Sequence, residues 1–183
     1  MIVILLADGF EEIEALTPLD MLRRAGVNVA SVSISDELAV TGAHGITVMA
    51  DITRDSLDLS CIDFAIFPGG MPGAKNLDES DFTDRIIKAV TENHGRLAAI
   101  CAAPMILGRR GLLEGKKSCC YPGFESELHG AVISYEPCIT DGNITTARGM
   151  GAALSFAEEI IRLIKGKDLQ EKISKAIIRE VTQ

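Results

Sequence analysis

A mostly parallel α/β fold, with helices on both faces of one sheet, is predicted by two features of the sequence. Short apolar runs of strand length alternate with longer stretches of helical periodicity. The first run, residues 2–7 (IVILLA), is continuously apolar, as is typical of a parallel strand buried on both faces. We treat residues 1–183 as one domain, long enough to bury about 70% of its unfolded surface.

The remaining elements follow along the chain. Residues 8–26 predict a helix with acids in its first turn, arginines in its last turn and Gly26 at its end. Residues 168–181 place apolar side chains on one helical face, so this tail is expected to pack against the rest of the molecule: Leu169, Ile173, Ala176, Ile177 and Val181. We expect further strands at 27–35, 62–67, 97–101, 131–135 and 143–147, a β-hairpin at 38–51, and helices at 81–95, 103–111 and 149–166.

Composition and charge narrow the range of partners. The formal net charge is −8 and no basic run offers a footprint for phosphates, which argues against nucleic-acid binding and leaves small carbonyls, amines or proteins. The apolar start is too short for a membrane span and has no basic leader, so we expect a cytoplasmic protein. The five cysteines include no CxxC pair and no zinc-ligand spacing, so neither a disulfide framework nor a metal or other cofactor is expected.

Three irregular segments follow predicted strands: residues 7–12 (ADGFEE), 68–73 (PGGMPG) and 101–104 (CAAP). The carboxyl ends of parallel strands meet at one edge of the sheet, where such folds bind ligands. We therefore expect the functional site where these segments converge.

Cys101 is the candidate nucleophile. It lies between a predicted strand and a helix whose first turn contains Pro104, and Ala102 and Ala103 keep that turn small. A helix N-terminus stabilises an anion by only about 0.3–1 kcal/mol, and no Lys, Arg or His adjoins this cysteine. A thiolate here would need further stabilisation. The alternative is an inert core cysteine, which we also expect for most of the other four.

Glu14 is the candidate partner of the thiol. Its spacing places it on the same helix face as Phe10, Thr17 and Met21, where burial would raise its pKa. The hypothesis is that Glu14 is protonated and donates a hydrogen bond to the Cys101 sulfur, because an ionised carboxylate would suppress a thiolate. The alternative is an ordinary surface glutamate.

The glycine-rich segment supplies candidate anion donors. Gly69 and Gly70 permit close backbone approach, and their amides, with that of Ala102, would hold a developing oxyanion. The segment matches neither phosphate-binding fingerprint. Arg148, in the segment RGMG, is a candidate residue for binding an anion or for an interface contact. The alternative is that this segment is only the start of a helix.

The histidines argue against a Cys–His protease. His44 lies in the predicted hairpin, His94 at the end of a predicted helix and His129 in a polar loop, and none directly follows Cys101. We expect all three to be solvated or structural.

Three motifs together carry a family resemblance: EExE at the first helix, PGGxxGAxNL in the glycine-rich segment and AAICAxP around Cys101. The chain resembles the ThiJ/PfpI superfamily, in the branch of the Parkinsonism-associated protein deglycase, over almost its whole length. The resemblance implies a flavodoxin-like three-layer sandwich, usually a homodimer. It also implies that Cys101 is a readily oxidised nucleophile, Glu14 its protonated partner, and Gly70 and Ala102 the amide donors.

Two departures from the family pattern matter. Tyr121 stands where some relatives carry a histidine, so proton transfer at this position is in doubt and Tyr121 is retained as an auxiliary residue with Arg148. Ala102 stands where the protease-like branch carries a histidine after the nucleophile, which makes proteolysis a poor fit.

Three functions are therefore considered. The leading one is a cysteine enzyme acting on reactive α-oxoaldehydes or early glycation adducts, of the glutathione-independent glyoxalase or deglycase type. The second is a redox sensor or stress-protective, chaperone-like protein that signals through sulfination of Cys101. The third is a cysteine hydrolase or amidotransferase, disfavoured by the missing histidine.

Overall fold

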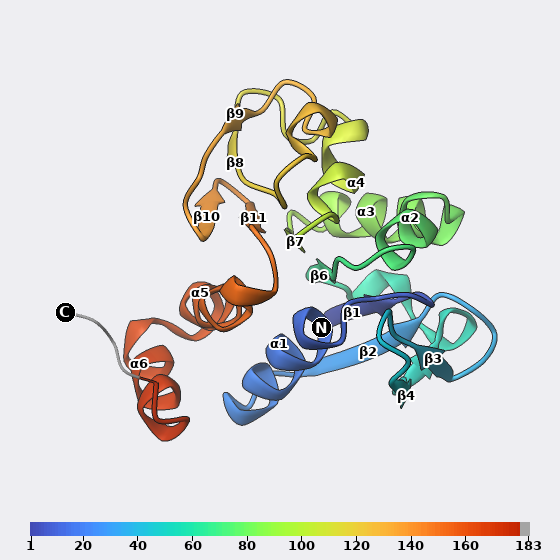
Figure 1. Ribbon diagram of the computed structural model, residues 1–183. Coiled ribbons are helices and arrows are strands. Elements are labelled where there is room, and N and C mark those ends of the chain that lie inside the picture. Colours follow the sequence, from blue (N-terminus) through green and yellow to red (C-terminus); the bar gives the residue numbers. More distant parts are fainter. Residues whose placement is uncertain (180–183) are drawn as a thin grey trace.

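The computed structural model describes residues 1–179 and confirms the predicted mostly parallel sheet with helices around it (Figure 1). Within those residues, the main sheet contains, in spatial order, β10 (Cys138–Asp141), β11 (Ile144–Ala147), β7 (Arg96–Ile100), β6 (Phe64–Phe67), β1 (Ile2–Leu6), β2 (Val29–Ser33) and β5 (Ile52–Thr53). All neighbouring strands are parallel except β10, which runs antiparallel to β11.

The order of the strands determines where a ligand can bind. From β1 the chain passes to β2 on one side and later to β6 on the other side, so the order reverses between β1 and β6. The five strands β2, β1, β6, β7 and β11 therefore have the flavodoxin-like order 2-1-3-4-5. The carboxyl ends of β1 and β6 form the switch point, where doubly wound folds bind ligands.

Helices cover both faces of the sheet (Figure 1). The helices are α1 (Glu12–Arg24), α2 (Gly73–Asp78), α3 (Asp81–Glu92), α4 (Pro104–Arg109), α5 (Ala153–Lys165) and α6 (Lys167–Ala176). Short 3₁₀ turns occupy Arg54–Ser56, Leu59–Cys61, Glu125–Glu127 and Met150–Ala152. Helices α1, α5 and α6 share one apolar core with the sheet, and α2, α3 and α4 share the core on the opposite face. Side chains of β1 alternate between the two cores. Val3 and Leu5 pack on the face of α2, α3 and α4, whereas Ile2, Ile4 and Leu6 pack on the face of α1, α5 and α6.

Two small sheets lie outside the main one. The predicted hairpin is present as the antiparallel pair β3 (Ala39–Thr41) and β4 (Thr47–Met49). The predicted strand at 131–135 is present only in part, as β9 (Val132–Ile133), which pairs with β8 (Lys117–Ser118) outside the main sheet. Val132 is 53% exposed, so this apolar segment does not supply a buried strand.

The helix at the end of the described chain packs largely as expected. Ile173 is buried in the core shared by α1 and α5, and Leu169 and Ile177 pack against it. The prediction for Ala176 is wrong, because this residue is exposed, and Val181 lies outside the described residues. No helix in the part of the chain that the structure describes has the length and apolarity needed to cross a bilayer.

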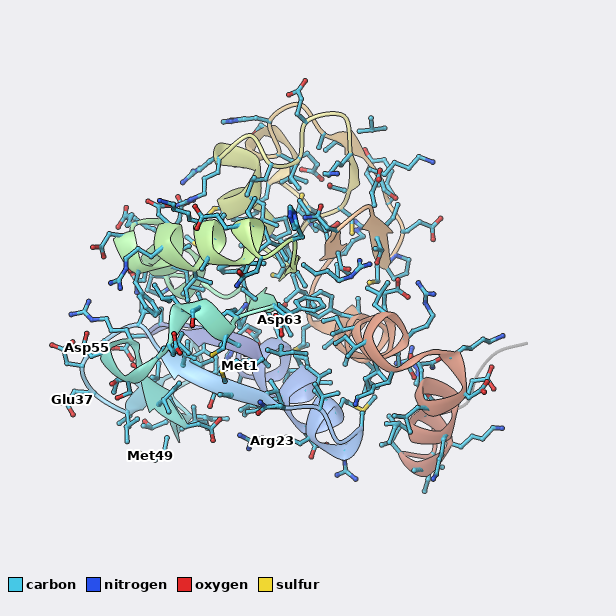
Figure 2. All side chains as sticks on the ribbon, turned by 180° about the vertical axis from the view of Figure 1, so that it is seen from behind. Met1, Arg23, Glu37, Met49, Asp55 and Asp63 are labelled. Carbon is cyan, nitrogen blue, oxygen red and sulfur yellow. The ribbon has the colours of Figure 1, made fainter. Side chains whose placement is uncertain are left out.

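Polar contacts join the ends of several elements. The Met1 ammonium donates to Asp63 Oδ2 at 2.7 Å, which ties the start of β1 to the segment before β6 (Figure 2). Arg23, near the end of α1, donates to both oxygens of Asp51, at 2.8 and 2.6 Å. Asp51 in turn accepts from the backbone and hydroxyl of Ser31 on β2, so α1 is anchored to the sheet beyond its apolar face.

Truncation of Phe156 tests the core that holds α1 in place. Phe156 on α5 is fully buried, and we expect Phe156→Ala to lower the free energy of unfolding by about 3–5 kcal/mol through lost burial and a cavity. Lys165→Ala, at an exposed site near the end of the same helix, should cost less than about 1 kcal/mol. Urea unfolding monitored by circular dichroism measures both, and similar losses would contradict this assignment of the core.

Candidate active site

Cys101 lies at a tight turn between β7, which ends at Ile100, and α4, which begins at Pro104. Its φ of 66° is in the left-handed region, which costs a non-glycine residue about 1–3 kcal/mol and is found most often at functional sites. The turn is held from both sides: the Cys101 N–H donates to the Ala147 carbonyl at 2.9 Å, and its carbonyl accepts from the Tyr121 N–H at 2.8 Å. The backbone is therefore fixed independently of the thiol.

Glu14, in the first turn of α1, is only 1% exposed. Its Oε2 accepts a hydrogen bond from the Gly69 N–H at 3.0 Å, across 55 positions of sequence. Its Oε1 is buried and accepts no hydrogen bond from residues 1–179. A buried carboxylate with an unpaired oxygen is costly, so this environment favours the neutral acid.

The structure brings Glu14 and Cys101 together, with Gly69 between their chains. A Cβ at Gly69 would lie 2.6 Å from both Cys101 Cβ and Glu14 Oε2, so only glycine leaves room for the pair. Side chains from α1 and from the end of β7 thus meet beside the loop that follows β6. This is the switch point of the sheet.

Burial controls the protonation of the pair. It raises the pKa of the Glu14 carboxyl to about 7, against the opposing effect of hydrogen bonds from Cys101 and Gly69. It also raises the pKa of the Cys101 thiol to about 12, and the negative charge of an ionised Glu14 is the second cause. Between these values the two groups hold one proton together, so the pair carries a single negative charge.

Backbone amides act on the sulfur. The N–H groups of Gly70 and Ala102 interact with the Cys101 side chain and oppose the rise in its pKa. Gly69 was expected to serve with them, but its N–H is already donated to Glu14. Sequence reasoning therefore missed the role of Gly69 in holding the carboxyl, because the direction of a loop amide cannot be read from residue type.

The two auxiliary candidates lie beside the pair rather than in it. Tyr121 is 51% exposed, and its ring packs near Gly149: a Cβ there would lie 3.4 Å from Tyr121 Cδ2 and 3.9 Å from Glu14 Oε1. The Arg148 guanidinium lies over the ring of Tyr135, 5.8 Å from its centroid. Gly149, which separates Tyr121 from Glu14, was not singled out from the sequence.

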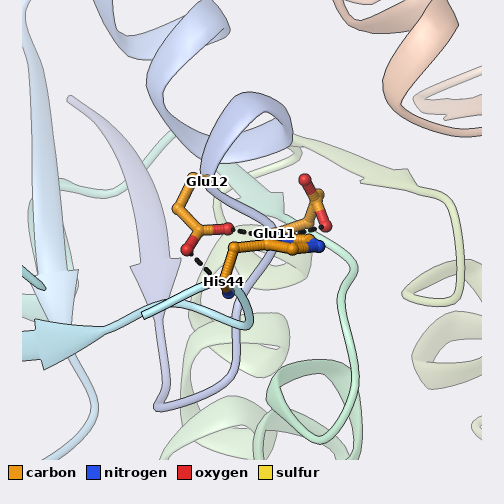
Figure 3. A group of neighbouring side chains, drawn as sticks. All are labelled: Glu11, Glu12 and His44. Atoms are coloured by element: carbon orange, nitrogen blue, oxygen red, sulfur yellow. Dashed lines mark hydrogen bonds and ion pairs between the residues drawn. The ribbon is translucent and has the colours of Figure 1, made fainter. Parts of the chain in front are cut away.

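A cluster of Glu11, Glu12 and His44 connects α1 to the β3–β4 hairpin (Figure 3). The buried Glu12 accepts from the His44 N–H at 2.8 Å through Oε1, and its Oε2 lies 3.0 Å from His44 Nδ1. Burial tends to raise the pKa of Glu12, but the hydrogen bonds from His44 outweigh it and lower the pKa. These are the side chains with metal-ligand spacing in residues 1–179. Both Glu12 oxygens are engaged by His44, so Glu12 anchors the hairpin to α1.

The remaining thiols differ in their surroundings. Cys119 and Cys120 are buried, Cys138 is half-buried and Cys61 is exposed. Burial raises the pKa of Cys119, whose N–H also donates to Thr146 Oγ1 at 2.9 Å. The Cys61 thiol lies at the surface and donates to the Asp58 carbonyl. None of these four faces Glu14.

The fold and the site together define a class: a doubly wound α/β protein that presents a cysteine at a strand-to-helix turn, facing a buried carboxyl at the switch point. The chain belongs to the DJ-1/PfpI family, whose model matches residues 1–163.

Individual relatives agree with this membership. DJ-1 homolog B of Arabidopsis thaliana is 34% identical over 180 residues, which cover 97% of this chain but only 41% of that protein. A deglycase of Thermococcus kodakarensis is 30% identical, with 90% of this chain and 99% of that one covered. The structure of oxidized Toxoplasma gondii DJ-1 superposes with a TM-score of 0.93 at 30% identity, covering 98% of both chains.

Replacement of Glu14 tests its protonation. The folded carboxyl has a pKa of about 7 and the unfolded one 4.5, so the parent should lose stability as pH rises from 4.5 through 7, by about 3 kcal/mol in total. The glutamine in Glu14→Gln cannot ionise, and its oxygen still accepts the hydrogen bond from the Gly69 N–H. The variant should therefore not lose stability as pH rises, and it should be more stable than the parent at about pH 8. Urea unfolding at about pH 5 and about pH 8 measures the difference.

Glu12→Gln is the matched control for this experiment. Glu12 is also buried, but its pKa is lowered, so its replacement should reduce stability at about pH 8. Parallel pH dependences for the parent and Glu14→Gln would contradict the raised pKa of Glu14.

Proposed function

We propose that the chain is a glutathione-independent glyoxalase or deglycase, in which Cys101 attacks α-oxoaldehydes or their early adducts with amines and thiols. The observation that carries this proposal is the contact between a thiol and a carboxyl whose pKa is about 7. A general acid–base group is most effective when its pKa is near the working pH. The deglycase name of an archaeal relative supports the same substrate class.

The first step is addition to the aldehyde. The Cys101 sulfur forms a bond to the aldehyde carbon, and the carbonyl π electrons move to oxygen. The amides of Gly70 and Ala102, which act on the sulfur in the free protein, would stabilise this oxyanion. The single proton of the pair then passes through Glu14 to the oxygen, giving a hemithioacetal and a Glu14 carboxylate.

The second step is an internal redox rearrangement. The Glu14 carboxylate removes the proton from the former aldehyde carbon and returns it to the neighbouring ketone carbon through an enediol. The aldehyde carbon is oxidised to a thioester while the ketone is reduced to an alcohol, so no external oxidant or cofactor is needed. Glu14 is assigned this role because its carboxyl lies beside Cys101, to which the substrate would be bonded.

The last step is hydrolysis. Water adds to the thioester, the carbon–sulfur bond breaks, and a 2-hydroxy acid leaves while the thiol is regenerated. For methylglyoxal the balance is one dicarbonyl plus one water to one lactate. With an early adduct of an amine or thiol, the same attack on carbon would release the amine or thiol as the leaving group.

Turnover of methylglyoxal tests the proposed function. Purified parent protein should produce lactate, and Cys101→Ser and Glu14→Gln should each lower kcat by at least about 100-fold, because one removes the nucleophile and the other the proton shuttle. Cys61→Ser, at an exposed thiol away from the site, is the matched control and should keep full activity. Equal turnover by the parent and Cys101→Ser would refute the enzyme assignment.

We also propose that the chain forms a homodimer. Ile13, Ile46 and Leu154 are 47%, 55% and 39% exposed and line one groove between α1, the hairpin and α5. Contiguous exposed apolar surface of this kind is typical of interaction sites. Sedimentation analysis should find a dimer for the parent and a monomer for Ile13→Glu, whereas Met49→Glu, an exposed site outside the groove, should remain dimeric; a monomeric parent would contradict the proposal.

A further inference from the structure

A second feature borders the Cys101–Glu14 pair: an open cavity of about 410 Å³. We name it the Tyr121–Met150 pocket, and its walls are formed chiefly by Tyr121, Pro122, Pro137, Arg148, Met150 and Ala152. The loop after Cys120 supplies one wall and the turn that leads into α5 supplies the other.

The walls of the pocket adjoin both Cys101 and Glu14. The Tyr121 N–H donates to the Cys101 carbonyl, so this wall is bonded directly to the nucleophile's turn. Gly149 lies between the ring of Tyr121 and the carboxyl of Glu14. A Cβ at Gly149 would lie 3.4 Å from Tyr121 Cδ2 and 3.9 Å from Glu14 Oε1. Gly149 therefore lies beside the carboxyl while its neighbours Arg148 and Met150 line the pocket, so the same short turn borders both.

The walls are chemically suited to an apolar group. Tyr121 and Met150 are 51% and 53% exposed, so two large apolar side chains present surface that a ligand would remove from water. A phenol ring and a thioether both pack well against an aromatic ring. Arg148 is the charged residue among the lining side chains, and it stands near Tyr135, where it would attract an anionic product.

We propose that the Tyr121–Met150 pocket binds the substituent attached to the dicarbonyl group, so that the preferred substrates are α-oxoaldehydes with an aromatic or bulky apolar substituent. This inference rests on the proposed function and specifies its substrate class. The chemistry is unchanged: phenylglyoxal plus water gives mandelate. The methyl group of methylglyoxal is too small to cover either side chain, so it gains little from the pocket.

Substrate preference provides the first test. The ratio of kcat/KM for phenylglyoxal to that for methylglyoxal should be at least about 10 in the parent. Met150→Ala and Tyr121→Ala should each lower this ratio several-fold, and Tyr121→Phe should retain it because the ring remains. Met49→Ala, at a methionine on β4 that is 68% exposed, is the matched control and should leave the ratio unchanged. A ratio near 1 in the parent, or one that Met150→Ala leaves unchanged, would overturn the proposal.

Binding to the inactive Cys101→Ser protein provides a test that needs no turnover. With ¹³C-methyl-labelled methionines, mandelate should shift the resonance of Met150 and not that of Met49, and lactate should shift neither. If mandelate moves the Met150 signal while the parent turns over neither aldehyde, the pocket is upheld and the proposed function fails. If methylglyoxal is turned over but mandelate leaves Met150 unmoved, the function stands and the pocket assignment is wrong.

Discussion

The contact between a buried carboxyl and a thiol, holding one proton between them, is the interaction on which the site depends. Glu14 is almost completely buried, with one oxygen hydrogen-bonded to the Gly69 amide and the other without a partner among residues 1–179. Burial therefore raises its pKa to about 7, into the range where a carboxyl can both give and take a proton. The protonation of Cys101 is controlled by burial, by Glu14 and by two backbone amides.

The fold explains how residues so distant in sequence form this contact. The reversal of strand order between β1 and β6 leaves their carboxyl ends adjacent, and β7 lies next to β6. The segment that leads into α1 follows β1, the glycine-rich loop follows β6, and the Cys101 turn follows β7. Two further contacts secure the arrangement: Cys101 is bonded to β11 through Ala147, and the buried Glu12 holds the hairpin through His44.

Much of this could be predicted from the sequence, for identifiable reasons. The continuous apolar run at 2–7 and the mostly apolar run at 62–67 correspond to the buried parallel strands β1 and β6, because a strand covered on both faces favours apolar residues along its length. Helical spacing placed Glu14 on the face of Phe10 and Met21, and all three are buried. Edge strand β10 was missed because it is only half-buried and contains Thr140 and Asp141, so its apolar signal is weak. The Gly69 and His44 contacts were missed because they depend on long-range loop geometry.

The raised pKa of Cys101 has a consequence for selectivity. A thiol activated by a neighbouring cation is present as thiolate at neutral pH and reacts with many electrophiles. Here burial and the charge of Glu14 keep the sulfur protonated, so nucleophilicity develops only when the proton can move to Glu14 and a new anion is stabilised elsewhere. A carbonyl meets both conditions, because its oxygen becomes the anion and then accepts that same proton. An alkylating agent instead leaves the proton on Glu14 and sends the new anion into solvent, so the proton is not used again within the site. Under the proposed function, carbonyl addition is the reaction that uses the shared proton of the pair.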